Sequence, residues 1–304
     1  MTSLQRGLMV CLLLAVMPAI SQAGSPSVLE TPHFSFEFPS QQRKVAKHLA
    51  DSAEAVRKQH CRLIQPCFEG VIKVQIARSE EQFLDLQPHE AHIDWAAGVA
   101  YADLQLIILR VDKDILLTIE ETFEHEVSHI LLLQAVKRRP PRWFIEGMAI
   151  VQARQNLIER FEKVAAASIN DNALSLDRIA RVFPDSTEGR GLAYAQSGLF
   201  VSYLVNEFGE KKMARFVSTL SRSSDFKQAF LDVFGLPLAA AEVEWKATLG
   251  NYGWLKSLTD SWIIWGGAAL LMLAALGTRL RRRRRSASLA EDDSAEWEYR
   301  SRNP

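Results

Sequence analysis

The chain has 304 residues, of which 48% are hydrophobic and 24% are charged. This composition is typical of a folded protein and excludes a disordered chain, a collagen-like repeat and a disulfide-dense miniprotein. The 36 basic residues balance the 36 acidic ones, which argues against a strongly basic nucleic-acid-binding protein. The charges are nevertheless distributed very unevenly along the chain.

The N-terminal segment is predicted to be a secretory signal peptide. Arg6 precedes a nearly all-apolar run from Gly7 to Ile20, and small residues follow at Ser21 and Ala23. The run is short for a membrane-spanning helix. We therefore expect residues 1–23 to be removed by cleavage after Ala23. A retained N-terminal anchor is the alternative.

The next part of the chain reads as strands first and helices later. Strands are expected at residues 33–38, 71–76, 98–101 and 104–109. Helices are expected at residues 41–60 and in a further segment that begins at Ser79. Beyond about residue 112 the pattern is mostly helical. This order predicts an α+β domain with a mixed or antiparallel N-terminal sheet. Residues 24–257 are enough for one sizeable core with two subdomains.

Two cysteines, Cys61 and Cys67, lie in this predicted domain. An even pair in an oxidising compartment is compatible with a disulfide that closes a short loop. Two free or merely buried thiols are the alternative, and the pair is too sparse to be a metal site by itself.

The most informative stretch runs from Thr122 to Leu132 and contains the pattern His-Glu-x-x-His. On a helix, His125 and His129 lie on one face, so their imidazoles can bind the same metal ion. Neutral imidazole suits zinc, which acidifies a bound water. Glu126 lies one step, about 100°, around the helix, and can accept the proton of that water as a general base. The alternative is a pair of histidines in a polar-lined core.

Zinc catalysis needs a third protein ligand, and Glu146 is the best candidate. Pro141 can occupy the first turn of a helix, and Glu146 follows in an apolar stretch, where an isolated carboxylate is costly unless it meets a cation. It comes 17 positions after His129, which leaves room for a turn and an antiparallel helix. A surface glutamate is the alternative, which the apolar neighbours disfavour.

A second apolar run, residues 261–278, is predicted to be a transmembrane helix. Trp262 and Trp265 are typical of one membrane interface, and Arg279 with Arg281–Arg285 of a cytosolic one. The arginines could form a nucleic-acid patch or a localisation signal, but the adjoining apolar segment favours a membrane flank. We expect residues 279–304 to be a disordered cytosolic tail and the domain to lie on the exported side, in a bacterium the periplasm.

Residues 125–129 and 143–149 together resemble the gluzincin metallopeptidases, and among them the peptidase MA-like families. The shared pattern is His-Glu-x-x-His followed by Trp-x-x-Glu-Gly-x-Ala. The resemblance implies a zincin-like fold with an active-site helix and a helical C-terminal subdomain. It also implies one zinc ion (Zn2+) held by His125, His129 and Glu146, with Glu126 as general base and acid.

The resemblance covers roughly residues 30–220. Residues 95–109 are similar to the edge strand that pairs with extended substrate in these families. Tyr194 is the candidate for a tyrosine that hydrogen-bonds the oxyanion, with a core or capping role as the alternative. Ile150 departs from some gluzincins, which have an Asp there that orients a zinc histidine. Residues 98–101 lack the acidic residue of the aminopeptidase branch, which favours an endopeptidase.

The sequence therefore favours a membrane-anchored zinc metallopeptidase, a hydrolase that acts on peptide or protein substrates and not on nucleic acid. A non-catalytic gluzincin-like scaffold or binding module in the cell envelope is the alternative, and the intact Glu126 argues against it. The remaining histidines show no ligand-like spacing: His33, His48, His60, His89 and His92.

Overall fold

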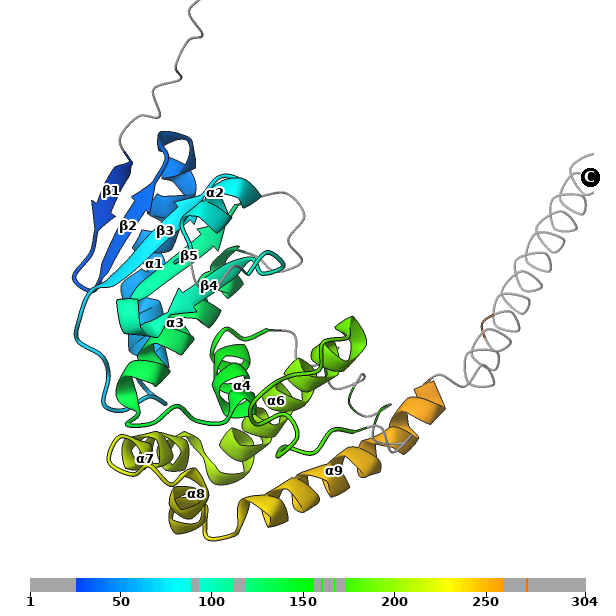
Figure 1. Cartoon of the computed structure of the whole chain (residues 1–304). Coiled ribbons are helices and arrows are strands. Elements are labelled where there is room, and N and C mark those ends of the chain that lie inside the picture. The colour runs from blue at the N-terminus through cyan, green and yellow to red at the C-terminus, as the bar shows by residue number, and fades with distance from the viewer. Residues whose placement is uncertain are drawn as a thin grey trace, which may run out of the picture. The chain divides into compact units, whose positions relative to one another are not determined.

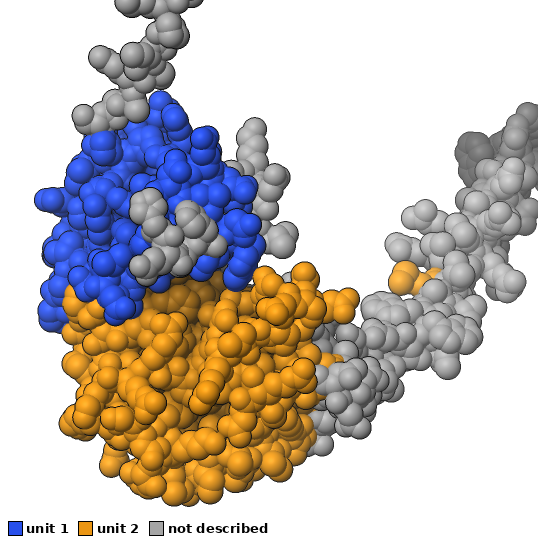
Figure 2. Space-filling view, in the orientation of Figure 1, with its two compact units in different colours: residues 1–56, 69–123 blue, residues 57–68, 124–304 orange. Residues whose placement is uncertain are grey.

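The computed structural model describes residues 26–88, 93–111, 119–155, 160, 164, 167, 173–259 and 272. The predicted signal peptide and cytosolic tail lie outside these residues, as does the predicted transmembrane helix apart from Met272. The chain divides into two compact units, which Figure 2 colours separately. Unit 1 comprises residues 1–56 and 69–123, and unit 2 comprises residues 57–68 and 124–304.

Unit 1 is built on a five-stranded mixed sheet with the strand order β1-β2-β3-β5-β4 (Figure 1). The central strands β2, β3 and β5 are parallel, whereas β1 and β4 pair antiparallel with their neighbours at the two edges. The strands are β1 (Ser27–Glu30), β2 (Phe34–Phe38), β3 (Ile72–Ala77), β4 (Gly98–Tyr101) and β5 (Leu106–Arg110). The mixed α+β prediction is confirmed, including the edge position of β4.

Each face of the sheet carries its own apolar layer because alternate side chains of a strand point to opposite faces. On one face, Phe34 and Phe36 of β2 meet the ring of Phe123, at centroid distances of 5.7 and 5.9 Å. On the other, Ile108 and Phe83 belong to a buried cluster with Ala77 and Val99. Phe83 comes from the short helix α2 (Glu80–Asp85), which begins where the Ser79 hydroxyl accepts a hydrogen bond from the Gln82 amide.

The expected strand at 104–109 begins two residues later in the structure. Residues Ala102–Leu104 form a 3-10 turn, and Gln105 adopts the left-handed conformation with φ of 48°. A residue in that conformation cannot continue an extended strand, so β5 runs from Leu106 to Arg110. Strand β1 was not predicted from the sequence.

Two helices cross the boundary between the units, α1 (Arg43–His60) and α3 (Ile119–Ala135). The rest of unit 2, as far as the structure describes it, is mostly helical, as the sequence predicted for this part of the chain. Its further helices are α4 (Arg142–Gln152), α6 (Thr187–Phe208), α7 (Glu210–Leu220), α8 (Phe226–Phe234) and α9 (Leu238–Thr259) (Figure 1). Within the described part of the chain, no helix is both long and apolar enough to cross a membrane.

Buried aromatic rings join the helices of unit 2 to one another. Trp143 of α4 lies 5.2 Å from Phe200 of α6, and Phe200 lies 5.3 Å from Trp245 of α9. Phe144 meets Phe216 of α7 at 5.4 Å. Tilted and edge-on ring contacts of this kind add to the stabilisation from burial alone, so α4 is held firmly in its place.

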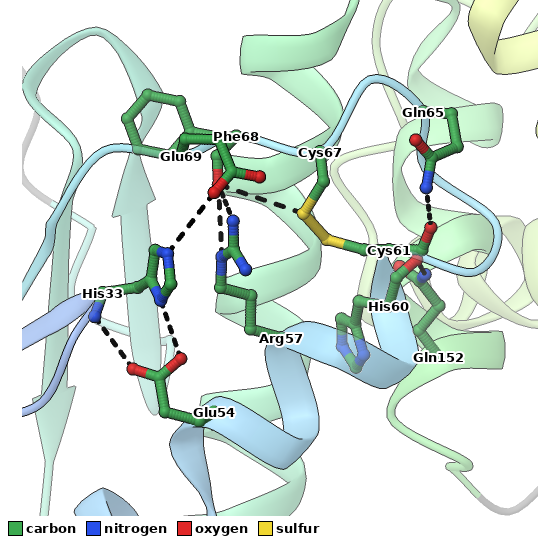
Figure 3. The surroundings of a disulfide bond; sticks show 10 residues. All are labelled: His33, Glu54, Arg57, His60, Cys61, Gln65, Cys67, Phe68, Glu69 and Gln152. Carbon is green, nitrogen blue, oxygen red and sulfur yellow. Dashed lines mark hydrogen bonds and ion pairs between the residues drawn. A yellow bond between two sulfur atoms is a disulfide. The ribbon is translucent and has the colours of Figure 1, made fainter.

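Cys61 and Cys67 form a disulfide in unit 2, with their Cα atoms 5.4 Å apart (Figure 3). The short loop that it closes follows the end of α1. Three further hydrogen bonds hold this loop: Gln65 donates one to the carbonyl oxygen of Cys61, and Arg57 donates two to that of Phe68. The pairing that the sequence left open is therefore present.

Candidate metal centre

Helix α3 presents the first two candidate ligands. His125 and His129 lie one turn apart on the same face, with ring centroids 4.7 Å from each other. Their side chains are each only 14% exposed. The helix is buried around them, since Val127, Ile130 and Leu132 are fully buried. This agrees with the apolar pattern on both sides of the motif.

Helix α4 supplies the third candidate ligand. It begins directly after Pro141, which occupies the N-cap position, close to the position expected from the sequence. The side chain of Glu146 is 12% exposed, and its Oε2 lies 3.5 Å from Nε2 of both His125 and His129. The return of the chain that brings Glu146 to the histidines of α3 is therefore present, and a surface glutamate is excluded.

The three side chains form a group that could hold a metal ion. One ligand atom from each of His125, His129 and Glu146 lies within 4.8 Å of the other two. Two imidazole nitrogens and one carboxylate oxygen are a donor set that zinc accepts. Because both Nε2 atoms face the same carboxylate oxygen, the residues present fit a single ion.

Close packing against α6 fixes the backbone next to Glu146. A Cβ atom at Gly147 would overlap the carbonyl oxygen of Ser197 and lie 2.5 Å from Cγ2 of Val201. On the facing helix, a Cβ at Gly198 would lie 2.6 Å from Cγ2 of Ile150. The two glycines let α4 and α6 approach at this level, so Glu146 projects from a backbone that has little room to move.

Charges in the site are strongly coupled. Burial by itself raises the pKa of Glu146, but hydrogen bonds from His125 and His129, and their charge, outweigh it and hold this pKa far below its usual value. Burial by itself lowers the pKa of His129, but the hydrogen bond to Glu146 and its charge raise it. The carboxylate of Glu146 is therefore the anionic partner of the group.

Glu126 differs from Glu146 in its surroundings. Its side chain is buried, and burial raises its pKa above the ordinary value, although His129 and His125 act in the opposite direction. A buried carboxyl group with a raised pKa is well matched to proton transfer near neutral pH. The pKa values of the two buried carboxyl groups, Glu126 and Glu146, are therefore shifted in opposite directions.

Tyr194 of α6 and Arg142 of α4 lie near each other and near Glu146. Burial raises the pKa of Tyr194 to about 12, and the charge of Glu146 adds to this effect. The guanidinium of Arg142 lies over the ring of Phe183, 4.6 Å from its centroid, and its Nε is 3.6 Å from Oε1 of Glu146. Phe183 also packs edge-on against Tyr194.

A family model described as the Peptidase MA superfamily matches residues 72–251. The chain belongs to this superfamily. The gluzincin-like resemblance drawn from the two motifs is thereby confirmed. No curated protein sequence matches the chain.

Two similar solved structures are leukotriene A4 hydrolases of yeast. One is the native enzyme from Saccharomyces cerevisiae, with 12% identity, a TM-score of 0.40, and coverage of 69% of this chain and 36% of that chain. The other is the yeast enzyme in complex with bestatin, with 13% identity, a TM-score of 0.43, and coverage of 80% and 39%. This Peptidase MA chain thus spans well under two thirds of the length of either.

The Nδ1 atoms of His125 and His129 have different hydrogen-bond surroundings in this Peptidase MA protein. Nδ1 of His125 lies 3.4 Å from the side-chain amide of Gln155, whose oxygen accepts a hydrogen bond from Arg160. Nδ1 of His129 is buried and has no hydrogen-bond partner among the described residues. Ile150, where some gluzincins have an orienting Asp, is fully buried. An outer partner for the ring is therefore present at His125 and, among the described residues, missing at His129.

Sequence reasoning did not identify Gln155 as a partner of His125. A glutamine just beyond a helix end carries no local signal for such a contact. Two other histidines, His89 and His92, lie outside the described residues.

Proposed function

We propose that the chain is a zinc-dependent metallopeptidase. The observation that supports this most directly is the convergence of His125, His129 and Glu146 on one point, with Glu126 adjacent on α3. Zinc, when bound by these three residues, supplies Lewis-acid chemistry that acidifies a water molecule and polarises a carbonyl group. Membership of the Peptidase MA superfamily supports the same reaction class.

In the proposed reaction, Glu126 moves the protons. Its carboxylate accepts a proton from the attacking water and delivers it to the amine that leaves when the peptide bond breaks. The raised pKa of Glu126 favours both steps, because the group can be charged when it accepts and neutral before it donates. Glu146, with its lowered pKa, stays ionised and serves only as a ligand.

We assign the activity to internal peptide bonds. The edge strand β4 carries no acidic side chain between Gly98 and Tyr101 that could hold the amino terminus of a substrate. Its outer edge pairs with no other strand among the described residues and offers backbone groups to an extended peptide, a form of binding that depends little on sequence. Both features favour an endopeptidase that accepts protein or peptide substrates.

The proposed placement of the protein rests on its two apolar termini. Residues 1–23 have the pattern of a signal peptide, and residues 261–278 with the following arginines have that of a membrane anchor. The domain 24–257 would then work outside the cytoplasm, with residues 279–304 inside. The Cys61–Cys67 disulfide supports an oxidising compartment.

Glu126→Gln tests the function. The purified full-length chain should cleave an unfolded protein, and the variant should bind zinc equally well with a loss of rate of at least about a hundredfold. Glu81→Gln, which changes an exposed carboxylate on α2, is the control and should retain full activity. Unchanged turnover in Glu126→Gln would refute the mechanism. A parent chain that binds zinc and unfolded protein without cleaving it would instead favour the scaffold.

A further inference from the structure

Three buried polar side chains of unit 2 take no part in the reaction described above. Ser128 and His60 are 0% exposed and Gln152 is 4% exposed. Polar groups buried this deeply are costly unless they are hydrogen-bonded. Their hydrogen bonds connect three separate segments of unit 2: the end of α1, the middle of α3 and the end of α4.

The hydrogen bonds form a closed ring. His60 donates from Nε2 to the carbonyl oxygen of Glu124 at 2.9 Å. The backbone carbonyl of His60 accepts from the amide nitrogen of Gln152 at 3.0 Å. The amide oxygen of Gln152 accepts from the hydroxyl of Ser128 at 2.5 Å. Glu124 and Ser128 are four residues apart on α3, so the backbone of that helix closes the ring.

The ring includes the turn of α3 between Glu124 and Ser128, next to the two candidate histidine ligands. His125 lies between Glu124 and Ser128, and His129 follows Ser128 directly. At its other side the ring is attached to α4, the helix that supplies Glu146, through Gln152 in its last turn. The ring therefore links the helix with two candidate ligands to the helix with the third.

The third segment of the ring, the end of α1 at His60, is adjacent to the disulfide loop. His60 is followed directly by Cys61, whose bond to Cys67 closes the loop, and Gln65 donates to the carbonyl oxygen of Cys61 (Figure 3). Gln152 appears beside His60 in the same view. The carbonyl group that receives the Gln152 amide thus belongs to a segment that is itself covalently restrained.

We propose that Ser128, Gln152 and His60 are positioning residues, which set the spacing of α3 and α4 and thereby the geometry of His125 and His129 relative to Glu146. The inference rests on the proposed zinc function. Apolar packing resists separation of two helices but tolerates small slides, whereas a hydrogen bond fixes distance and direction together. Opening one bond of a buried ring leaves the other partners unsatisfied, so its members act as a unit.

A purely structural role would predict something different. In that case the loss of a ring member would lower the stability of the fold as much as the loss of any other buried polar side chain. The zinc Kd would not change selectively. Gln196 of α6 provides the matched comparison. It is also a buried glutamine, 0% exposed, and its side chain exchanges two hydrogen bonds with the backbone of Leu174.

The experiment compares Ser128→Ala, Gln152→Met and the control Gln196→Met in the full-length chain. Zinc affinity is measured by competition with a chromogenic chelator, and the visible spectrum of the cobalt-substituted protein reports ligand geometry. Thermal unfolding of the metal-free protein measures the structural cost. We expect the two ring variants to raise the zinc Kd about tenfold or more, the usual effect of losing an outer partner, and to alter the cobalt spectrum. Gln196→Met should lower the melting temperature but leave Kd and spectrum unchanged.

The double variant Ser128→Ala/Gln152→Met provides the second criterion. If the ring acts as a unit, the zinc Kd of the double variant should exceed the parental Kd by much less than the product of the two single fold-changes. Should Gln152→Met fail to fold, Ser128→Ala, which removes one hydroxyl group, gives the same comparison. Lower melting temperatures with parental zinc affinity and cobalt spectra in all variants would overturn the positioning role. A parent chain that binds no zinc would overturn the proposed function, and the positioning role with it.

Discussion

Gly147 lies so close to Ser197 that a Cβ atom at the glycine would overlap the backbone carbonyl oxygen of the serine. The glycine follows Glu146 directly, so α6 approaches α4 closely beside a candidate ligand. Glu146 and Gly147 are therefore adjacent residues with different roles: the first supplies the carboxylate, and the second leaves the space that α6 occupies.

Gly147→Ala should destabilise the metal-free chain by about 1–3 kcal/mol, the usual range for overpacking. The obstacle at Ser197 is backbone, which cannot rotate away, so α4 must shift and zinc affinity should fall as well. Urea unfolding and zinc titration measure the two effects. Adding Val201→Ala removes only the side-chain obstacle and should restore little. A Gly147→Ala protein as stable as the parent would show that the crossing is looser than described.

Tyr194→Phe should reduce kcat about a hundredfold or more, the usual cost of losing an oxyanion donor. With its pKa raised to about 12, chiefly by burial, the phenol of Tyr194 stays protonated at neutral pH and can donate a hydrogen bond. KM and zinc affinity should change little. Tyr203→Phe makes the same substitution on the same helix and should be silent. Equal kcat values for the two variants would leave Tyr194 with only a packing role.

Zinc should stabilise the folded chain by mass action. At a free concentration of 100 times Kd the gain is about 2.7 kcal/mol, seen as a higher melting temperature that a chelator reverses. His125→Ala and Glu146→Ala should lose both the metal, by elemental analysis, and this gain. His48→Ala, which changes a histidine that is 62% exposed, should keep both. Metal retained at full stoichiometry in Glu146→Ala would exclude Glu146 as a ligand.

Cys67→Ser should lower the free energy of unfolding by about 2 kcal/mol, the loop-entropy expectation for so short a loop. Adding a reductant to the parent chain should reproduce this loss, whereas the variant should not respond to it. Denaturant unfolding with and without reductant is the measurement. Identical stability of parent and variant under oxidising conditions would contradict the disulfide.

Acid should weaken unit 1 through Glu54. Burial by itself raises the pKa of Glu54, but hydrogen bonds from Thr31 and His33 outweigh it and lower it below the ordinary 4.5. Because the folded-state pKa is the lower one, the stabilisation is complete above pH 4.5 and is lost as pH falls through the folded-state value. Glu54→Gln should therefore be less stable at neutral pH and lose less stability on acidification, as measured by unfolding at several pH values. If the free energy of unfolding changed with pH to the same extent in the parent and in Glu54→Gln, the role assigned to Glu54 would be refuted.

The parts that could be predicted from sequence are those with local physical causes. Helical spacing brings His125 and His129 to one face, and the cost of an isolated carboxylate among apolar neighbours singles out Glu146. The hydrogen-bond ring of Ser128, Gln152 and His60 could not be predicted in this way. Its hydrogen bonds join residues that are far apart in the chain, so no local sequence pattern indicates them. Strand β1 is four residues long and half-exposed, so its apolar pattern is too short to detect.

The three candidate ligands lie within 22 consecutive residues, from His125 to Glu146, although they end up on two helices. Bringing the ends of so short a segment together costs little chain entropy. The parallel pairing of β2, β3 and β5 requires contacts between residues much further apart, which form more slowly. The ligand group can therefore assemble early in folding, and a metal ion captured at that stage would favour the native arrangement of His125, His129 and Glu146 before the sheet is complete.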